Sequence, residues 1–118
     1  IPSEIGRLKK LNIFSALSNT FSGSIPTEIG FLTLLETLKM SDNAFTGTIP
    51  MELGLLKRAI VILLDDNMLV GPIPTVLGLL TSLIQLMLNE NHLTGEVPSE
   101  LGRLTKLSQL ELQSNTLE

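Results

Sequence analysis

The side chains able to do acid–base or metal chemistry are few in this chain. Its 118 residues contain one histidine, His92, and no cysteine. A histidine acting as a general base needs a nucleophile and an orienting carboxylate around it, and nothing near His92 in the sequence marks such partners. Cysteine nucleophiles, thiolate zinc sites and multi-histidine metal sites are excluded outright. We therefore expect no catalytic residue, no metal site and no cofactor.

Four acidic residues stand at related positions of the sequence. Asp65 and Asp66 are adjacent, and Asp42 and Glu90 stand 24 residues before and after Asp66. A calcium loop would place its oxygen ligands at set short intervals, and these residues do not follow such a spacing. The favoured interpretation is a solvated acidic surface.

The composition limits the classes of partner. The formal net charge is −4, from 8 Lys and Arg against 12 Asp and Glu. This balance argues against nucleic acid, whose affinity comes mainly from cations on phosphates. No uncharged apolar run reaches the roughly 18 residues of a membrane span, so we expect no membrane contact by this segment. With 43% hydrophobic residues, the chain is expected to fold.

The glycines and prolines that must position these side chains lie on a grid with a step of 24 residues. One series holds Gly6, Gly30, Gly54, Gly78 and Gly102, and the other holds Gly23, Gly47, Gly71 and Gly95. Five of the six prolines and five asparagines keep the same step. A fixed period of this length indicates a repeat protein. We divide the chain into units 1–24, 25–48, 49–72, 73–96 and 97–118, and expect them to be part of a longer array.

The repeated pattern is I-P-x-x-L-G-x-L-x-x-L-x-x-L-x-L-x-x-N-x-L-x-G-x. Its L-x-G-x-I-P segment stands at 21–26, 45–50, 69–74 and 93–98, with Phe or Val in some places. The pattern resembles the plant-type leucine-rich repeat, found in receptor-like kinase ectodomains and polygalacturonase-inhibiting proteins. The resemblance covers the whole chain. It departs from the family in having no cysteine-containing caps.

Each unit has one stretch in which apolar and polar residues alternate, as in Leu38-Lys39-Met40. Period two predicts a short strand with one face inward, and such a strand is stable only when stacked on copies of itself. The expected fold is an α/β repeat solenoid. The resemblance implies a right-handed coil with a parallel sheet on the concave face and short helical or 3₁₀ and extended segments on the convex face.

Three groups of residues have predicted structural roles. The series from Gly23 to Gly95 is expected at turns with positive φ, and the series from Gly6 to Gly102 where neighbouring coils pack closely. Glu4, Glu28, Glu52 and Glu100 would complement the exposed N–H groups of a first helical turn. The resemblance implies a structural asparagine ladder that pairs buried backbone groups, formed by Asn19, Asn43, Asn67, Asn91 and Asn115.

The strand face is the predicted binding surface, because solenoids bind on the surface that their strands present. Its side chains vary between units while the framework repeats. Val61, Leu63 and Met87 are expected to form an exposed apolar patch, and seven of the eight basic residues to lie on the outer helical part. The predicted partner-binding residues are Ile13, Lys39, Asp42, Val61, Leu63, Asp65, Asp66, Gln85, Met87, Glu90, Gln109 and Glu111.

The leading hypothesis is a non-catalytic module that binds a protein or peptide, one with a basic patch, through this face. Two alternatives stay open. The chain is the sensor segment of a membrane receptor-like Ser/Thr kinase whose catalytic domain lies elsewhere, or it is a structural spacer. Further partners would be neighbouring repeats or caps. The resemblance implies an extracellular or ectodomain location, and an intracellular one stays open.

Overall fold

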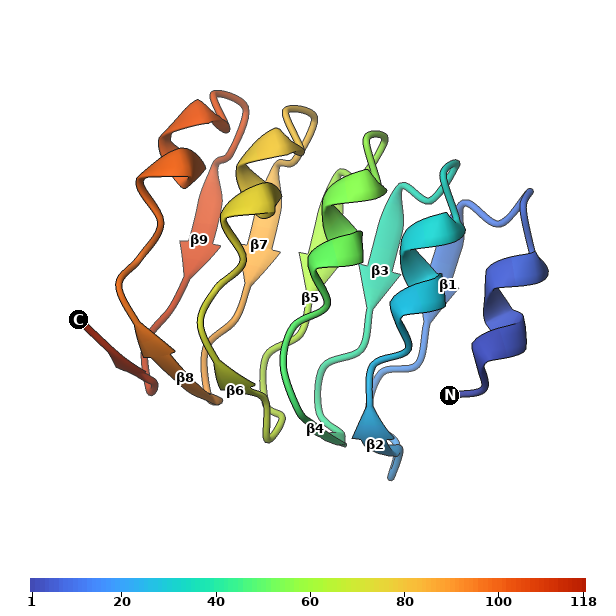
Figure 1. Ribbon diagram of the computed structural model, residues 1–118, viewed down its shortest axis with the longest axis horizontal. Helices are drawn as coiled ribbons and strands as arrows, with labels where there is room; N and C mark the ends of the chain where they lie inside the picture. Colours follow the sequence, from blue (N-terminus) through green and yellow to red (C-terminus); the bar gives the residue numbers. More distant parts are fainter.

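The computed structural model describes all residues 1–118 as five stacked coils (Figure 1). In each coil a strand lies on one side and a short helix on the other, and the two termini lie at opposite ends of the stack. The predicted solenoid is confirmed. None of its helices has the length and apolar content that a membrane crossing needs.

The main sheet is parallel and contains one strand from each coil. Its strands, in order, are β1 (Ile13–Ser15), β3 (Thr37–Lys39), β5 (Val61–Leu63), β7 (Gln85–Met87) and β9 (Gln109–Glu111). Each residue pairs with the residue 24 positions later, as Thr37 pairs with Val61. The register therefore places equivalent side chains of all units in straight columns.

The helical segments are all of the 3₁₀ type, which settles the expectation of a short helix or 3₁₀ turn. They are η1 (Ser3–Arg7), η2 (Thr27–Phe31), η3 (Met51–Leu55), η4 (Thr75–Leu79) and η5 (Ser99–Arg103). A proline with extended backbone precedes each one, for example Pro50 at φ −63°. Proline suits this position because its missing N–H would find no partner at a helix start.

A second set of short strands follows the main sheet in each coil and was not predicted. These strands are β2 (Ser22–Ser24), β4 (Ala44–Thr46), β6 (Val70–Gly71), β8 (His92–Gly95) and β10 (Thr116–Leu117). They form a pair, β2–β4, and a triplet, β10–β8–β6, joined by a single bridge between Thr48 and Val70. These strands come just before the Ile-Pro pairs of the repeated pattern.

The core fills the space between the main sheet and the helices. A cluster of 23 buried residues runs through the stack, and Leu38, Ile62 and Leu86 point into it from successive strands. The close-packing role of the first glycine series is confirmed at Gly6, Gly30, Gly54 and Gly78, and a Cβ on Gly54, for example, would lie 2.8 Å from Cβ of Val76. It does not hold at Gly102, where an added Cβ would meet no atom within 4 Å. The positive φ of the second series is also confirmed, with Gly47 at +75°.

Candidate functional site

The strand face is the outward side of the five-stranded sheet, and its columns are those that the sequence predicts. Ile13, Val61, Gln85 and Gln109 fall in one register column, and Lys39, Leu63, Met87 and Glu111 fall in the next. Strands of one sheet lie about 4.8 Å apart, so neighbours in a column are in side-chain contact range. The structure therefore brings these eight predicted residues together on one surface.

The apolar part of this face is less exposed than predicted. Val61, Leu63 and Met87 are half-buried, not fully exposed. The cause is the in-register sheet, in which each side chain is flanked by those of the strands before and after it. Ile13 has only one such neighbour and is 57% exposed. The apolar patch is therefore a shallow surface at the centre of the stack, not a set of protruding side chains.

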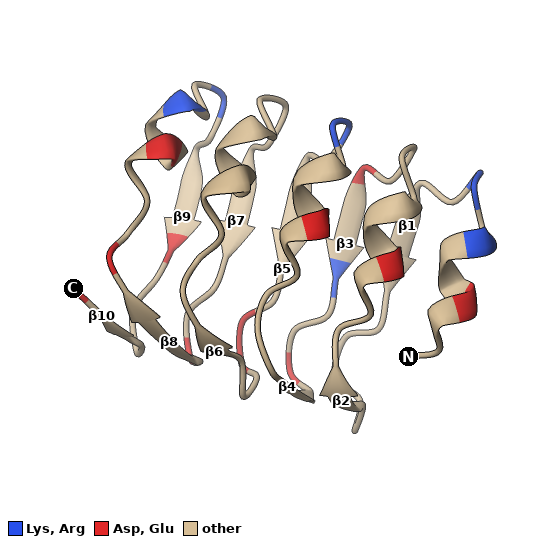
Figure 2. Cartoon of the chain, in the orientation of Figure 1, with Lys and Arg blue, Asp and Glu red and all other residues tan.

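The acidic edge lies directly after the strands and consists of Asp42, Asp65, Asp66 and Glu90. Figure 2 shows these acidic residues in the loops beyond the arrowheads of the strands. Asp42, Asp66 and Glu90 are exposed and have positive φ values of 58°, 52° and 53°. Their carboxylates therefore project from equivalent tight turns of three neighbouring coils, as the 24-residue spacing predicts.

The nearby carboxylates of the acidic edge affect the pKa of one of its members, Asp66. Desolvation, and then the charges of Asp65, Glu90 and Asp42 in that order, raise the pKa of Asp66 above its usual value. Ser41 holds Asp65 in place, because its Oγ donates a hydrogen bond of 2.5 Å to Oδ1 of that residue. No three acidic or histidine side chains converge as ligands for a metal ion. The edge is thus a surface of negative potential that attracts cationic groups.

The basic residues lie elsewhere than predicted. We define the rim as the turns that lead from each 3₁₀ helix to the next strand, residues 7–12, 31–36, 55–60, 79–84 and 103–108. All seven cations assigned to the outer helical part lie in the rim: Arg7 and Arg103 are the last residues of 3₁₀ helices, and the other five lie in the turns beyond the helices. Figure 2 shows them at the top of the stack, opposite the acidic edge. Composition by unit gave no sign of this, because helix and turn adjoin in sequence.

Four of the five asparagines of the predicted ladder hydrogen-bond to the backbone of the preceding coil. Asn67, which is 8% exposed, accepts a 3.0 Å hydrogen bond from the N–H of Phe45 and donates one of 3.0 Å to the carbonyl of Met40. Asn43, Asn91 and Asn115 make the equivalent bonds to the preceding coil. Asn19 bonds only to carbonyls of its own coil. The ladder is a structural element and leaves the strand face free for other contacts.

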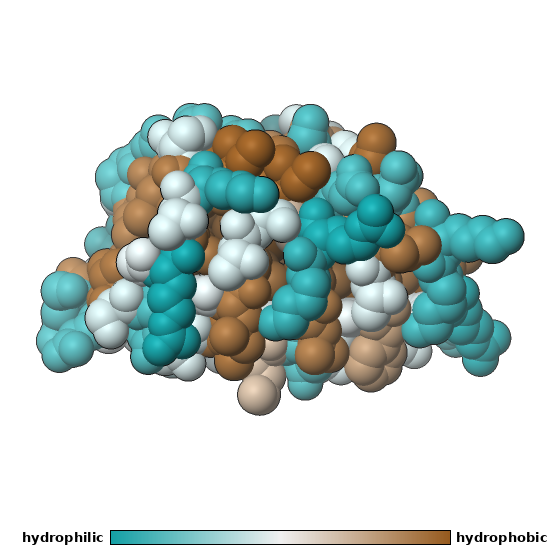
Figure 3. Space-filling view, turned by 90° about the horizontal axis from the view of Figure 1, so that it is seen from above, coloured by the Kyte–Doolittle hydropathy of each residue, from teal (hydrophilic) through white to brown (hydrophobic).

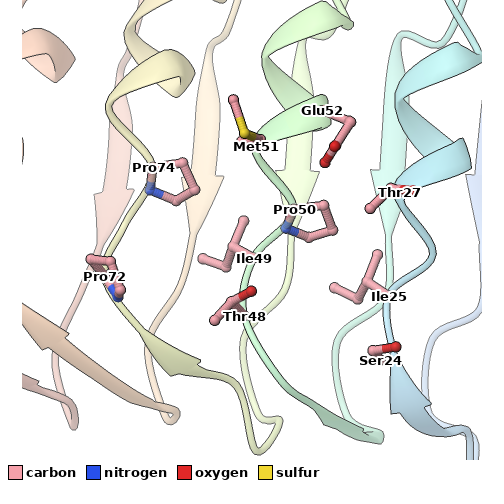
Figure 4. A pocket seen from close by; sticks show the side chains of 10 residues that line it. All are labelled: Ser24, Ile25, Thr27, Thr48, Ile49, Pro50, Met51, Glu52, Pro72 and Pro74. Carbon is pink, nitrogen blue, oxygen red and sulfur yellow. The ribbon is translucent and has the colours of Figure 1, made fainter.

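The outer side carries a hollow of about 490 Å³ between the Ile-Pro segments of the second, third and fourth coils. Figure 4 shows Pro50 and Pro74 beside it, with Met51 and Glu52 at the start of η3. Glu52 is its one ionisable lining residue. Its other polar lining residues carry hydroxyl groups and are Ser24, Thr27 and Thr48.

Comparison with known proteins agrees with the repeat geometry. The Leucine Rich Repeat family model matches residues 34–56 and 82–104, and each match contains a strand of the main sheet, the short strand after it and a complete 3₁₀ helix. Solved plant receptor kinase structures match 99 to 100% of this chain at 40 to 42% identity. The chain belongs to the leucine-rich repeat family, in its plant type. No curated protein sequence matches it.

Three solved structures illustrate the similarity of this leucine-rich repeat chain to plant proteins. The ectodomain of the membrane receptor kinase GASSHO1/SCHENGEN3 from Arabidopsis thaliana, in complex with CASPARIAN STRIP INTEGRITY FACTOR 2, matches with a TM-score of 0.99 and 40% identity over 100% of this chain and 14% of that one. The Arabidopsis receptor kinase HAESA, in complex with the peptide hormone IDA and the co-receptor SERK1, matches with a TM-score of 0.96 and 42% identity over 99% and 20%. A plant ice-binding protein matches with a TM-score of 0.91 and 31% identity over 99% and 38%.

These leucine-rich repeat relatives differ in length and in ligand. The chain spans much less than two thirds of each of the three proteins. Two of them are receptor ectodomains and one binds ice, so the shared coils establish the fold without selecting a ligand. The residues that differ between units must select it.

Sequence reasoning missed two features of this leucine-rich repeat surface. Ile60 and Ile84, which precede strands β5 and β7, line a hollow of about 310 Å³ together with Arg58 and Lys106. The only signal was that these two isoleucines replace the polar residues Asn12, Glu36 and Ser108 of the other units. The positive φ of Asp42, Asp66 and Glu90 was also not predicted, because an aspartate or glutamate in a sequence indicates this conformation less clearly than a glycine does.

Proposed function

We propose that the chain is a non-catalytic recognition module that binds a protein or peptide through its strand face. The observation that supports this most is that an apolar surface and an acidic surface lie side by side on the strand face. The half-buried apolar side chains of Val61 and Leu63 lie directly before the acidic turn of Asp65 and Asp66. Met87 pairs with Leu63 on the next strand and lies before Glu90. A partner with apolar residues beside lysine or arginine complements both surfaces.

The relatives support a peptide as the partner. HAESA is bound to a peptide hormone. The PEPR1–AtPEP1 structure has the same fold, at 38% identity over 99% of this chain. An extended peptide laid along the stack would meet equivalent positions of successive coils. The acidic edge then selects its basic residues, and the apolar side chains of Val61, Leu63 and Met87 contact its apolar residues.

A second candidate function is that of a sensor segment in a membrane receptor-like Ser/Thr kinase, located outside the cell. The receptor kinase ectodomains among the relatives favour it. In this case the same strand face binds the ligand, and catalysis belongs to a separate domain. The spacer alternative differs in a testable way, because it requires that the strand face binds nothing.

A selection from a phage-displayed library of random linear peptides tests the proposal. The purified chain is the bait, and a variant with Asp65→Lys and Asp66→Lys is the matched control, checked for folding by circular dichroism. We expect enriched peptides that combine lysine or arginine with apolar residues and that do not bind the variant. Enrichment of nothing, or of peptides that bind both proteins equally, would overturn the proposal.

A further inference from the structure

The rim carries a strong positive charge although the chain as a whole is negative. Its turns contain seven cations and a single carboxylate, that of Glu36. The cations are Arg7, Lys9, Lys10, Lys57, Arg58, Arg103 and Lys106. Figure 2 shows blue residues at the top of the first, third and fifth coils. The rim therefore has a potential opposite to that of the acidic edge on the other side of the sheet.

The charge of the rim is largely uncompensated. Only Arg58 faces a carboxylate, with its Nη2 atom 3.9 Å from Oε1 of Glu36. The ammonium groups of Lys9 and Lys57 donate to backbone carbonyls, those of Phe31 at 3.3 Å and of Gly54 at 2.7 Å. A carbonyl positions a cation without removing its charge, so these lysines still attract anions.

Large apolar side chains are interleaved with the cations. Leu8 is 51% exposed, Phe31 46%, Leu55 48%, Leu79 46% and Ile84 43%. Figure 3 looks onto the stack from this side and shows brown and teal surface next to each other. Contiguous apolar surface rimmed by charge is typical of a protein contact. Polyanions such as nucleic acid would use the cations and leave the apolar groups in water.

The rim is also hollowed. Ile60 and Ile84 line a hollow of about 310 Å³, and its charged lining residues are three cations and one carboxylate: Lys57, Arg58, Lys106 and Glu36. A second hollow, of about 590 Å³, lies at the first coil beside Leu8 and Lys10. Hollows accept side chains of a partner, whereas a plane of lipid headgroups meets only what protrudes. These observations favour a peptide segment over a membrane surface.

We propose that the rim is a second interaction surface, which binds an acidic segment of a protein whose carboxylates alternate with apolar residues. Apolar side chains of this segment occupy the hollow over Ile60 and Ile84, and its carboxylates pair with Arg58 and Lys106. This surface is separate from the strand face and does not depend on the function proposed for that face. The two surfaces have opposite charge, so they select different partners.

Three synthetic probes test this inference. They are labelled peptides in which leucine alternates with glutamate, with glutamine or with lysine, and fluorescence anisotropy measures their binding to the full chain. We expect the glutamate peptide to bind most tightly and to weaken as salt is added, because added ions screen exposed charges. Equal binding of the glutamate and glutamine peptides would overturn the proposal. So would binding of the chain to phosphatidylserine vesicles without binding of the glutamate peptide.

Three variants with the same change of charge locate the contact. Arg58→Glu acts on the rim and Lys39→Glu on the strand face, and Lys106→Glu is a second rim variant. We expect Arg58→Glu and Lys106→Glu each to weaken binding of the glutamate peptide at least about fivefold, and Lys39→Glu to change it by less than about twofold. An equal loss in all three variants would show that only overall charge matters and would overturn the proposed site.

Discussion

Ser41 of the second coil donates a hydrogen bond of 2.5 Å to Oδ1 of Asp65 in the third coil. The donor is buried, at 7% exposure, and the acceptor is half-buried at the surface. The buried hydroxyl of Ser41 thus fixes the position of the Asp65 carboxylate, close to the apolar side chains of Leu63 and Met87. Asp65 is the one member of the acidic edge that is held by a side chain of another coil. Its neighbour Asp66 projects into solvent beside it.

The first prediction concerns the pH dependence of stability at Asp66. Desolvation and the surrounding carboxylates raise the pKa of Asp66 in the folded state, so its ionised form is disfavoured there relative to the unfolded chain. Its effect on stability is therefore absent below the unfolded pKa of about 3.9 and becomes destabilising as the pH rises through the folded pKa. We expect the Asp66→Asn variant to gain stability over the parent as the pH rises.

Urea denaturation of both proteins at a series of pH values measures this difference. Because asparagine tolerates positive φ readily, the variant carries a constant backbone gain at every pH. Only the part of the stability difference that changes with pH therefore measures the effect of the Asp66 carboxylate. A stability difference that stays flat, or that shrinks towards neutral pH, would contradict the stated pKa direction.

The second prediction concerns the asparagine ladder. Asn67→Ala would leave the buried N–H of Phe45 without its acceptor. It would also remove one of the donors to the carbonyls of Met40 and Leu64, which keep their bonds from Asn43 and Asn91. A buried polar group left unpaired costs about 1–3 kcal/mol, so we expect a loss of roughly 2–3 kcal/mol in the free energy of unfolding. Asn19→Ala is the matched control, because Asn19 is exposed and bonds only to carbonyls of its own coil. Equal losses at both positions would speak against the ladder.

The third prediction concerns close packing between coils. Gly30 is buried, and an added Cβ would overlap the backbone carbonyl of Glu52 in the next coil, whereas a Cβ on Gly102 would meet open space. Gly30→Ala should therefore force the coils apart, at about 1–3 kcal/mol for overpacking. Gly102→Ala should be neutral or slightly stabilising. Thermal unfolding of the two variants separates these outcomes, and a tolerated Gly30→Ala would refute the packing role.

Much of this fold is predictable from the sequence, because one geometric need recurs in every coil. The glycines at 23, 47, 71 and 95 mark turns that require positive φ, and the leucines mark the inward side of each strand. The second row of strands was not predictable in the same way. The Ser-Gly-Ser segment of β2 and the Val-Gly segment of β6 are ordinary turn sequences, and only pairing with the next coil gives them hydrogen-bond partners.

The sequence predicts which residues of the site share a column of the sheet, but it does not predict how exposed each side chain is. The repeat fixes which residues share a column, so Leu63 and Met87 were placed correctly side by side. The burial of each depends on the side chains of both neighbouring strands, which a single-unit pattern does not contain. The positions of Lys57 and Arg58 also escaped prediction, because a shift of two residues moves a side chain from a helix into the rim.

The binding constant of a peptide from the library selection tests the central claim most directly. Isothermal titration compares the parent chain with Leu63→Glu, at the centre of the strand face, and with Met51→Glu, which makes the same kind of change at a 64% exposed residue on the outer side. We predict that Leu63→Glu weakens binding at least about tenfold, or roughly 1.4 kcal/mol, and that Met51→Glu leaves it unchanged. Unchanged binding by Leu63→Glu, or equal losses in both variants, would contradict recognition through the strand face.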